Sequence, residues 1–152
     1  LINEVFPKIS CSVSLNIGGK GLGRKIIQTI HNLEGVNYLG FVNDIDSFIA
    51  YQMLMVAPIH MGAGLKMKIT HSLACGTPVL TTPIGAEGIN IGSENGLWIE
   101  ESLEALSEKC LELMKNGQEL EKAGLRGKEA VNRLFSPPRV TTKLNALYLS
   151  LT

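Results

Sequence analysis

The stretch of the chain best suited to chemistry is a glycine-rich loop with basic residues, PIHMGAGLKMK at positions 58–68. Gly62 and Gly64 permit backbone conformations and close approaches that other residues forbid. An apolar run before the loop predicts a buried strand, and helical spacing after it predicts a helix. The start of a helix offers free N–H groups and a partial positive charge. With Lys66 and Lys68 adding full charges, the loop predicts a phosphate or diphosphate site.

The charges around this loop are unevenly distributed along the chain. No carboxylate occurs between Asp46 and Glu87. That interval holds four basic or imidazole side chains: His60, Lys66, Lys68 and His71. An acid-free, cationic loop mouth is therefore expected, and it would favour an anionic ligand. Lys68 and His71 lie three residues apart, so they would share one edge of the helix. The alternative is that both lysines are ordinary solvated surface charges.

The elements that must position the loop alternate between strands and helices. The apolar runs predict strands at 13–17, 36–42, 53–58, 78–81 and 96–99. The 3.6-residue pattern predicts helices at 23–33, 44–51, 65–75, 102–115, 118–135 and 139–151. Asp44 is expected to be an N-cap, and Gly76 to end the third helix. This order predicts an α/β fold with a Rossmann-like parallel sheet covered by helices on both faces. Ligands of such sheets bind beyond the carboxyl ends of the strands.

Size and composition agree with that fold. A length of 152 residues suits one domain, spanning 1–152. Hydrophobic residues make up 45% and charged residues 18%, as expected for a sheet buried on both faces. Lys+Arg and Asp+Glu balance at 14 each, so the chain lacks the overall field that attracts nucleic acid. No apolar run suits a membrane span, and no signal-peptide pattern opens the chain. Because the first residue is leucine, a fragment is expected.

The cysteines and histidines suggest no metal centre. Cys11, Cys75 and Cys110 are far apart, odd in number and without a CxxC motif. They are best interpreted as small buried thiols in a reducing compartment. The three histidines, His31, His60 and His71, show no metal-ligand spacing with them. No metal is therefore expected.

Four motifs in a fixed order resemble a known family. They are VNYLGFVND at 36–44, the glycine loop with the two lysines, AxGxPV at 74–79, and GAEG at 85–88. The run from Pro58 to Ile89 resembles the donor-site region of group 1 glycosyltransferases, the large retaining, GT4-like family with the GT-B fold. The resemblance covers roughly residues 5–135.

The resemblance implies a two-domain enzyme of which this chain is the C-terminal, nucleotide-sugar-binding half. Such enzymes hold a sugar-nucleotide donor and an acceptor hydroxyl in a cleft between two Rossmann-like domains. The opening strand and helix of the second domain, and the whole acceptor domain, would precede Leu1. Residues 137–152 would form the last helix, which often packs back on the first domain. The chain alone would then be inactive.

The family also implies roles for particular residues. Lys66 and Lys68 would be catalytic, since they would stabilise the diphosphate as it leaves. The loop would offer backbone N–H groups to the donor, Phe41 and Val42 would border the base, and Glu87 would lie near the diphosphate or sugar. The full donor-binding set expected is Gly18, Phe41, Val42, Gly62, Ala63, Gly64, Leu65, His71 and Glu87.

His71 departs from the family pattern. Many members carry two glutamates eight positions apart, which correspond here to Ala63 and His71. The second glutamate normally contacts the ribose, and an imidazole can still form a hydrogen bond to a hydroxyl. Since histidine changes charge near neutral pH, donor binding would depend on pH. Alternatively, His71 marks a degenerate site or simply packs at the helix edge.

Three other functions compete with that of a donor domain. Gly18 to Gly23 suggests a dinucleotide site, but no G-x-G-x-x-G register fits. These glycines are better explained as a turn beside the donor cleft. A catalytically degenerate sugar-nucleotide-binding or scaffold protein is favoured by His71. A sugar-nucleotide epimerase would need further acid and base carboxylates, which the acid-free loop argues against.

The expected ligands and surroundings follow from the family. The substrate would be a nucleotide-diphosphate sugar such as a UDP- or GDP-sugar, with no metal cofactor. The acceptor would be a glycan or lipid-linked glycan, held by the N-terminal domain, in glycan or polysaccharide biosynthesis. No nucleic acid partner and no transmembrane segment are expected. The location would be cytoplasmic, with peripheral association at the inner membrane face through the rest of the protein.

Overall fold

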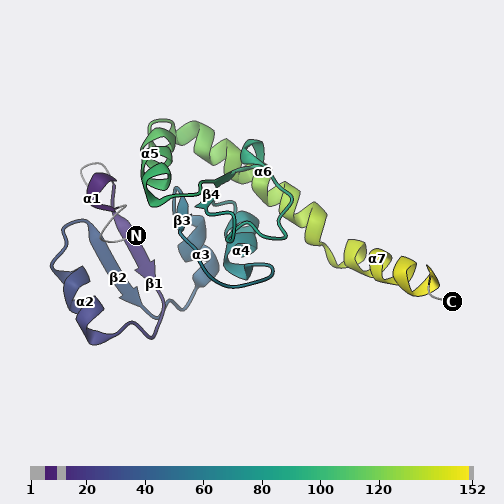
Figure 1. Ribbon diagram of the computed structural model, residues 1–152, viewed down its shortest axis with the longest axis horizontal. Coiled ribbons are helices and arrows are strands. Elements are labelled where there is room, and N and C mark those ends of the chain that lie inside the picture. The colour runs from purple at the N-terminus through teal and green to yellow at the C-terminus, as the bar shows by residue number, and fades with distance from the viewer. Residues whose placement is uncertain (1–5, 10–12, 151–152) are drawn as a thin grey trace.

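The computed structural model describes residues 6–9 and 13–150. Helices and strands alternate along the chain as the hydrophobic pattern predicts (Figure 1). The elements are α1 (Phe6–Ile9), β1 (Leu15–Gly18), α2 (Arg24–His31), β2 (Val36–Gly40), α3 (Ile45–Ala50), β3 (Met55–Ala57), α4 (Met67–Cys75), β4 (Val79–Thr81), the 3₁₀ helix η1 (Ser93–Asn95), β5 (Leu97–Ile99), α5 (Leu103–Met114), α6 (Gly117–Phe135) and α7 (Pro137–Ser150).

All strand pairs are parallel, as predicted, but they form two sheets rather than one. β1 pairs with β2, and β4 lies between β3 and β5. The β1–β2 pair stands with α2 to one side of the larger sheet (Figure 1). The predicted fold class of parallel strands with helices is confirmed, with the strands divided between two ladders. Within the described residues β1 and β3 share no ladder, and a cleft of about 600 Å³ lies between them. A side-chain hydrogen bond from Asn16 to Gln52, 2.8 Å long, crosses this side of the structure.

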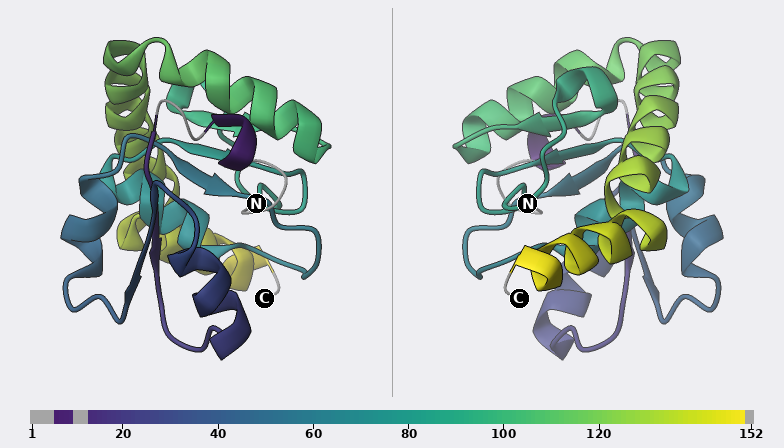
Figure 2. Two further views of the ribbon diagram at one scale, coloured as in Figure 1. Left: turned by 90° about the vertical axis from the view of Figure 1, so that its left-hand side faces the viewer. Right: turned by 90° about the vertical axis from the view of Figure 1, so that its right-hand side faces the viewer.

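Helices cover both faces of the β3–β5 sheet, as the composition predicts. On one face, Val79 and Leu97 pack against Ile69 and Leu73 of α4, and α6 adds further apolar side chains. On the other face, Leu80 packs against α5 and α1. Figure 2 shows α5 on one side of the sheet and α4 on the other. Because strand neighbours point to opposite faces, two adjacent residues of β4 serve two different cores.

The predicted caps of α3 and α4 are confirmed. Asp44 accepts a hydrogen bond from the backbone N–H of Ser47, 3.0 Å away, at the start of α3. Bonds from the Ser47 hydroxyl and N–H hold the pKa of Asp44 below its usual range. Gly76 ends α4 with φ of 90°, a conformation that glycine adopts without a steric penalty. α1 and η1 were not predicted, since each is only one turn long.

Two glycines of α6 let its backbone lie directly against the loops around the sheet. A Cβ at Gly124 would lie 2.0 Å from the carbonyl oxygen of Gly76, and one at Gly127 would lie 2.6 Å from that of Asn95. α7 then continues away from the body of the structure (Figure 1). Among the described residues, no helix is both long and apolar enough to cross a membrane.

The Gly124 contact gives a first prediction, on stability. Gly124→Ala should lower the free energy of unfolding by about 1–3 kcal/mol, because the added methyl forces α6 away from Gly76. Urea unfolding followed by circular dichroism measures the difference. The control is Gly117→Ala in the same helix, where the new methyl meets only the flexible end of Met53 at 3.3 Å. Equal effects of the two substitutions would contradict the close-packing argument.

Candidate functional site

Lys66 organises the glycine loop. Its ammonium donates to the carbonyl oxygen of Gly64 at 2.6 Å and lies 3.4 Å from that of Gly62. It also lies 3.3 Å from Glu87 Oε2. The side chain is only 12% exposed, so the charge is held against the loop rather than extended into solvent. Lys66 thereby ties the loop before α4 to the 85–88 turn after β4.

The two loop glycines adopt the conformations that the sequence suggested. Gly62 has φ of 112° and Gly64 has φ of 75°, both in the region that favours glycine. Ala63 is exposed between them, and Leu65 is 39% exposed. The loop before α4 therefore has small side chains at 62–64 and is exposed to solvent.

The N-terminus of α4 remains available to a ligand. The helix begins at Met67 rather than at Leu65 as predicted, and Lys66 occupies the N-cap position. No side chain of the described residues caps this end. Its first N–H groups therefore lack the side-chain partner that most helices have. Lys68 adds its charge in the first turn.

The expectation of an acid-free loop mouth holds along the chain but is wrong in space. The two carboxylates that bound the acid-free interval both fold back onto its basic residues. Glu87 pairs with Lys66, and Asp46 Oδ1 lies 2.7 Å from His71 Nε2. In the part of the chain that the structure describes, no carboxylate forms an ion pair with Lys68. Lys68 is therefore the loop lysine whose charge is not already offset.

The structure divides the predicted site residues into two neighbouring groups. The first is the loop group, in which Lys66 joins Gly62, Gly64 and Glu87. The second lines the cleft between β1 and β3, where Gly18, Lys68 and His71 come together. The predicted sharing of one helix edge by Lys68 and His71 is confirmed.

The two residues predicted to border the base lie just after β2. Val42 lies beside Gly18, since a Cβ on Gly18 would be 3.0 Å from Val42 Cγ2. Phe41 is 62% exposed, with the Lys20 ammonium 4.1 Å from the centre of its ring. Val42 therefore adjoins the cleft group, whereas the Phe41 ring faces solvent and a lysine.

Two threonines that the sequence analysis did not single out hold the loop in place. Thr81 donates its hydroxyl to Ala57 O at 2.6 Å. Thr82 donates to Ile59 O and accepts from the Gly85 N–H at 3.2 Å. Both are buried. Thr81, at the end of β4, ties this strand to the end of β3, and Thr82, just after β4, ties it to the start of the glycine loop. Hydroxyl residues directly after a buried strand were the available signal.

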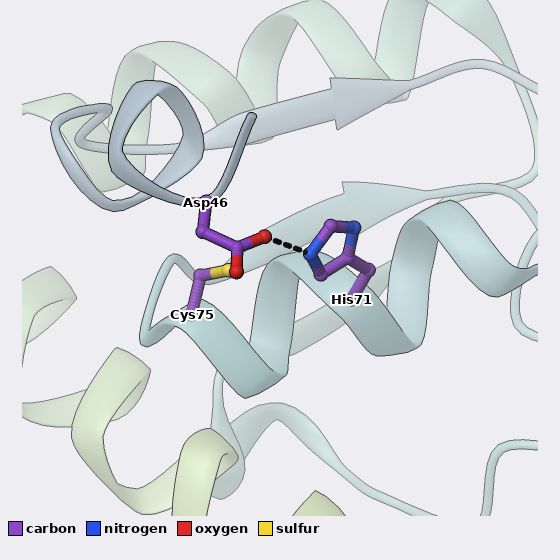
Figure 3. A group of neighbouring side chains, drawn as sticks. All are labelled: Asp46, His71 and Cys75. Carbon is purple, nitrogen blue, oxygen red and sulfur yellow. Dashed lines mark hydrogen bonds and ion pairs between the residues drawn. The ribbon is translucent and has the colours of Figure 1, made fainter. Parts of the chain in front are cut away.

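His71 also belongs to a second cluster of polar groups, which lies between α3 and α4. Asp46 of α3 and His71 and Cys75 of α4 place their ligand-type atoms within 4.8 Å of one another (Figure 3). The prediction that no histidine has metal-ligand spacing to a cysteine is therefore wrong, because positions four apart on a helix share a face. Burial raises the pKa of the Cys75 thiol, Asp46 adds to this, and Lys128 opposes it.

The other cysteines agree in part with the prediction of buried thiols. Cys110 is buried in α5, and burial raises the pKa of its thiol. Cys75 is only partly buried. Cys11 lies outside the described residues.

Comparison with solved structures defines the class of fold. HepE from Anabaena, solved with UDP, matches with a TM-score of 0.78 and 18% identity over 96% of this chain and 44% of its own. Sucrose-phosphate synthase from Thermosynechococcus elongatus matches at 0.77 and 17% over 99% and 42%. TarM matches at 0.80 and 20% over 97% and 31%. The described chain thus has the α/β architecture of part of a GT-B glycosyltransferase.

The sequence itself then identifies the family. The family model described as glycosyl transferases group 1 matches residues 1–116, so the chain belongs to this family. The chain spans less than half the length of the solved proteins it matches. No curated protein matches it in sequence.

The bonds of Lys66 predict that this residue orders the loop even without a ligand. Lys66→Met should speed amide hydrogen exchange in residues 60–66 by about tenfold or more, because a hydrogen bond to a charged group is worth about 1.5–3 kcal/mol. Lys68→Met should leave this exchange unchanged, since Lys68 holds no loop carbonyl among the described contacts. Equal exchange in both variants would show that Lys66 does not order the loop.

Proposed function

We propose that this chain binds a nucleotide-diphosphate sugar and serves as the donor domain of a glycosyltransferase. The observation that carries the proposal is the loop at 62–68. It places two glycines with positive φ and two lysines at an uncapped helix N-terminus. Backbone N–H groups, the partial charge of the helix end and the lysines all favour a diphosphate there. Membership in the glycosyl transferases group 1 family supports the same ligand class.

The two lysines would act at different stages of binding. Lys68 has no carboxylate partner among the described residues, so it meets the diphosphate first. Lys66 is held by Glu87, which is half exposed, and by two loop carbonyls. An incoming diphosphate competes with Glu87 for the ammonium. Because the loop already fixes its position, little reorganisation is needed as charge develops on the leaving diphosphate.

The base and ribose would lie toward the cleft group. Gly18 and Val42 are adjacent there, and His71 lines the same cleft. For Phe41 to border the base, its ring would have to leave Lys20, or its backbone would have to contact the base instead. The similar structure HepE was solved with UDP and with UDP-glucose, which makes uracil the first base to test.

The finer assignments extend this proposal. Transfer would be of the retaining, GT4 type, to an acceptor glycan or lipid-linked glycan held by the other domain, in cytoplasmic glycan or polysaccharide synthesis. The lysines and helix end would neutralise the diphosphate, so donor binding would need no metal. The chain alone would bind the donor without transferring the sugar.

Calorimetric titration with UDP and GDP tests the diphosphate site. Lys68→Met should weaken UDP binding by about tenfold or more, because it removes a charge-assisted contact worth about 1.5–3 kcal/mol. The double variant Lys66→Met, Lys68→Met should weaken it further, and added salt should weaken binding to the intact chain.

The matched control for these variants is Lys109→Met. Lys109 pairs with Glu112 at 2.6 Å within α5, away from the loop, so UDP affinity should not change. Unchanged affinity in the double variant would rule out the proposed site.

Glu87→Gln gives a prediction of opposite sign. Removing this carboxylate frees Lys66 from its ion pair, so UDP affinity should rise by about two- to fivefold, a modest effect typical of an exposed ion pair. If Glu87 also contacts the sugar, UDP-glucose should lose part of that gain. Weaker UDP binding in this variant would argue against competition between Glu87 and the diphosphate.

One observation favours a second function, a catalytically degenerate binding protein. His71, in the position of the family's ribose glutamate, is already engaged by Asp46 at 2.7 Å. In that case the complete protein would bind UDP-sugar but show no transfer or hydrolysis. Sugar transfer that Lys66→Met abolishes would instead establish the enzyme.

A further inference from the structure

Asp46, His71 and Cys75 form a compact group with three different kinds of metal ligand. Their carboxylate oxygen, imidazole nitrogen and thiol sulfur all lie within 4.8 Å of one another. Figure 3 shows the three side chains converging between α3 and α4. We propose that this group binds a divalent transition-metal ion, with Zn²⁺ the best match, and that water completes the coordination.

The backbone already supplies the geometry that such an ion needs. His71 and Cys75 are four residues apart on α4, so their side chains lie one helical turn apart on the same face. Zn²⁺ ligands at about 2.0–2.3 Å from the ion lie roughly 3.3–3.8 Å from one another in a tetrahedron. The present hydrogen bond from His71 to Asp46, at 2.7 Å, is somewhat closer than that. Asp46 is 75% exposed, so its side chain can rotate outward without disturbing the core.

The ligand chemistry selects the class of metal. Sulfur and imidazole nitrogen suit Zn²⁺ and Co²⁺, whereas Mg²⁺ and Ca²⁺ prefer oxygen ligands. Binding replaces the thiol proton of Cys75, which passes to solvent. The thiolate and the Asp46 carboxylate then offset the two positive charges of the ion. The Lys128 ammonium, the other charge that acts on Cys75, disfavours a cation here but is outnumbered by the two anionic ligands.

The site would be exchangeable rather than structural. Three protein ligands leave one position for water, as in open zinc sites, and all three side chains are at least partly accessible. The ion would link α3 to α4 across the side of the sheet that bears the cleft. The proposal does not rest on nucleotide binding, since its test reads only the metal.

Cobalt substitution tests the thiolate ligand directly. Co²⁺ added to the reduced chain should produce the near-ultraviolet thiolate-to-metal absorption band and visible bands of a low-coordinate site. Cys75→Ala should abolish the charge-transfer band, and Cys110→Ala, which removes a buried cysteine of α5, should retain it. No such band, or a band that survives Cys75→Ala, would overturn the proposal.

Zinc titration by calorimetry tests the other two ligands. His71→Ala and Asp46→Asn should each weaken Zn²⁺ binding by at least about tenfold, because changes in outer-shell partners alone cost roughly 10- to 100-fold. The control is His60→Ala, which removes an exposed histidine of the glycine loop. Equal weakening by His60→Ala and His71→Ala would mean adventitious surface binding and would overturn the site. Mg²⁺ should not compete.

Discussion

The structure depends on the complete burial of β4. Val79, Leu80 and Thr81 are each fully buried between β3 and β5 and between two layers of helices. Adjacent residues of this one strand contribute to both cores, so β4 joins the two helix layers. At and just after its carboxyl end, Thr81 bonds to Ala57 of β3 and Thr82 bonds to Ile59 of the glycine loop. The packing that stabilises the fold therefore also fixes the position of the glycine loop relative to the sheet.

The positive charges at that site have few carboxylate partners. The loop concentrates positive charge where the helix end is already partly positive, and without a ligand this arrangement repels itself. Glu87 offsets the charge of Lys66, and Asp46 pairs with His71, both from outside the loop sequence. Both carboxylates are well exposed, and exposed ion pairs of this kind contribute little to stability. A diphosphate bound as proposed would replace such weak partners without a change in the backbone.

Much of the fold followed from local rules. Strand and helix order, parallel pairing, the Asp44 cap and the left-handed Gly76 each rest on residues within one element, where hydrophobic period and capping chemistry are reliable. The break between β1 and β3 did not follow, because strand adjacency depends on contacts distant in sequence. The one-turn helices were too short to carry a periodic signal.

The candidate site shows the same limit. The conformations of Gly62 and Gly64 could be predicted, since they need only the local chain. The Glu87 and Asp46 pairs could not, because they join positions 21 and 25 residues apart. The positions of the two threonines at the end of a buried strand were a signal, but their partners, 23 and 24 residues away, could not be predicted. The sequence shows how far the carboxylates lie from the loop along the chain, whereas a ligand would be affected by how close they lie in space.

His71 shows how one substitution can connect two surfaces. A glutamate at this position would be repelled by Asp46, and would have to turn toward the cleft. An imidazole can accept or donate on either side, so it can pair with the α3 carboxylate while still lining the cleft. Cys75 lies one turn further along α4, on the face of the helix that is turned toward Asp46 of α3. His71 thus gives α4 contacts with both α3 and the cleft, while the loop before the helix is held separately by Lys66.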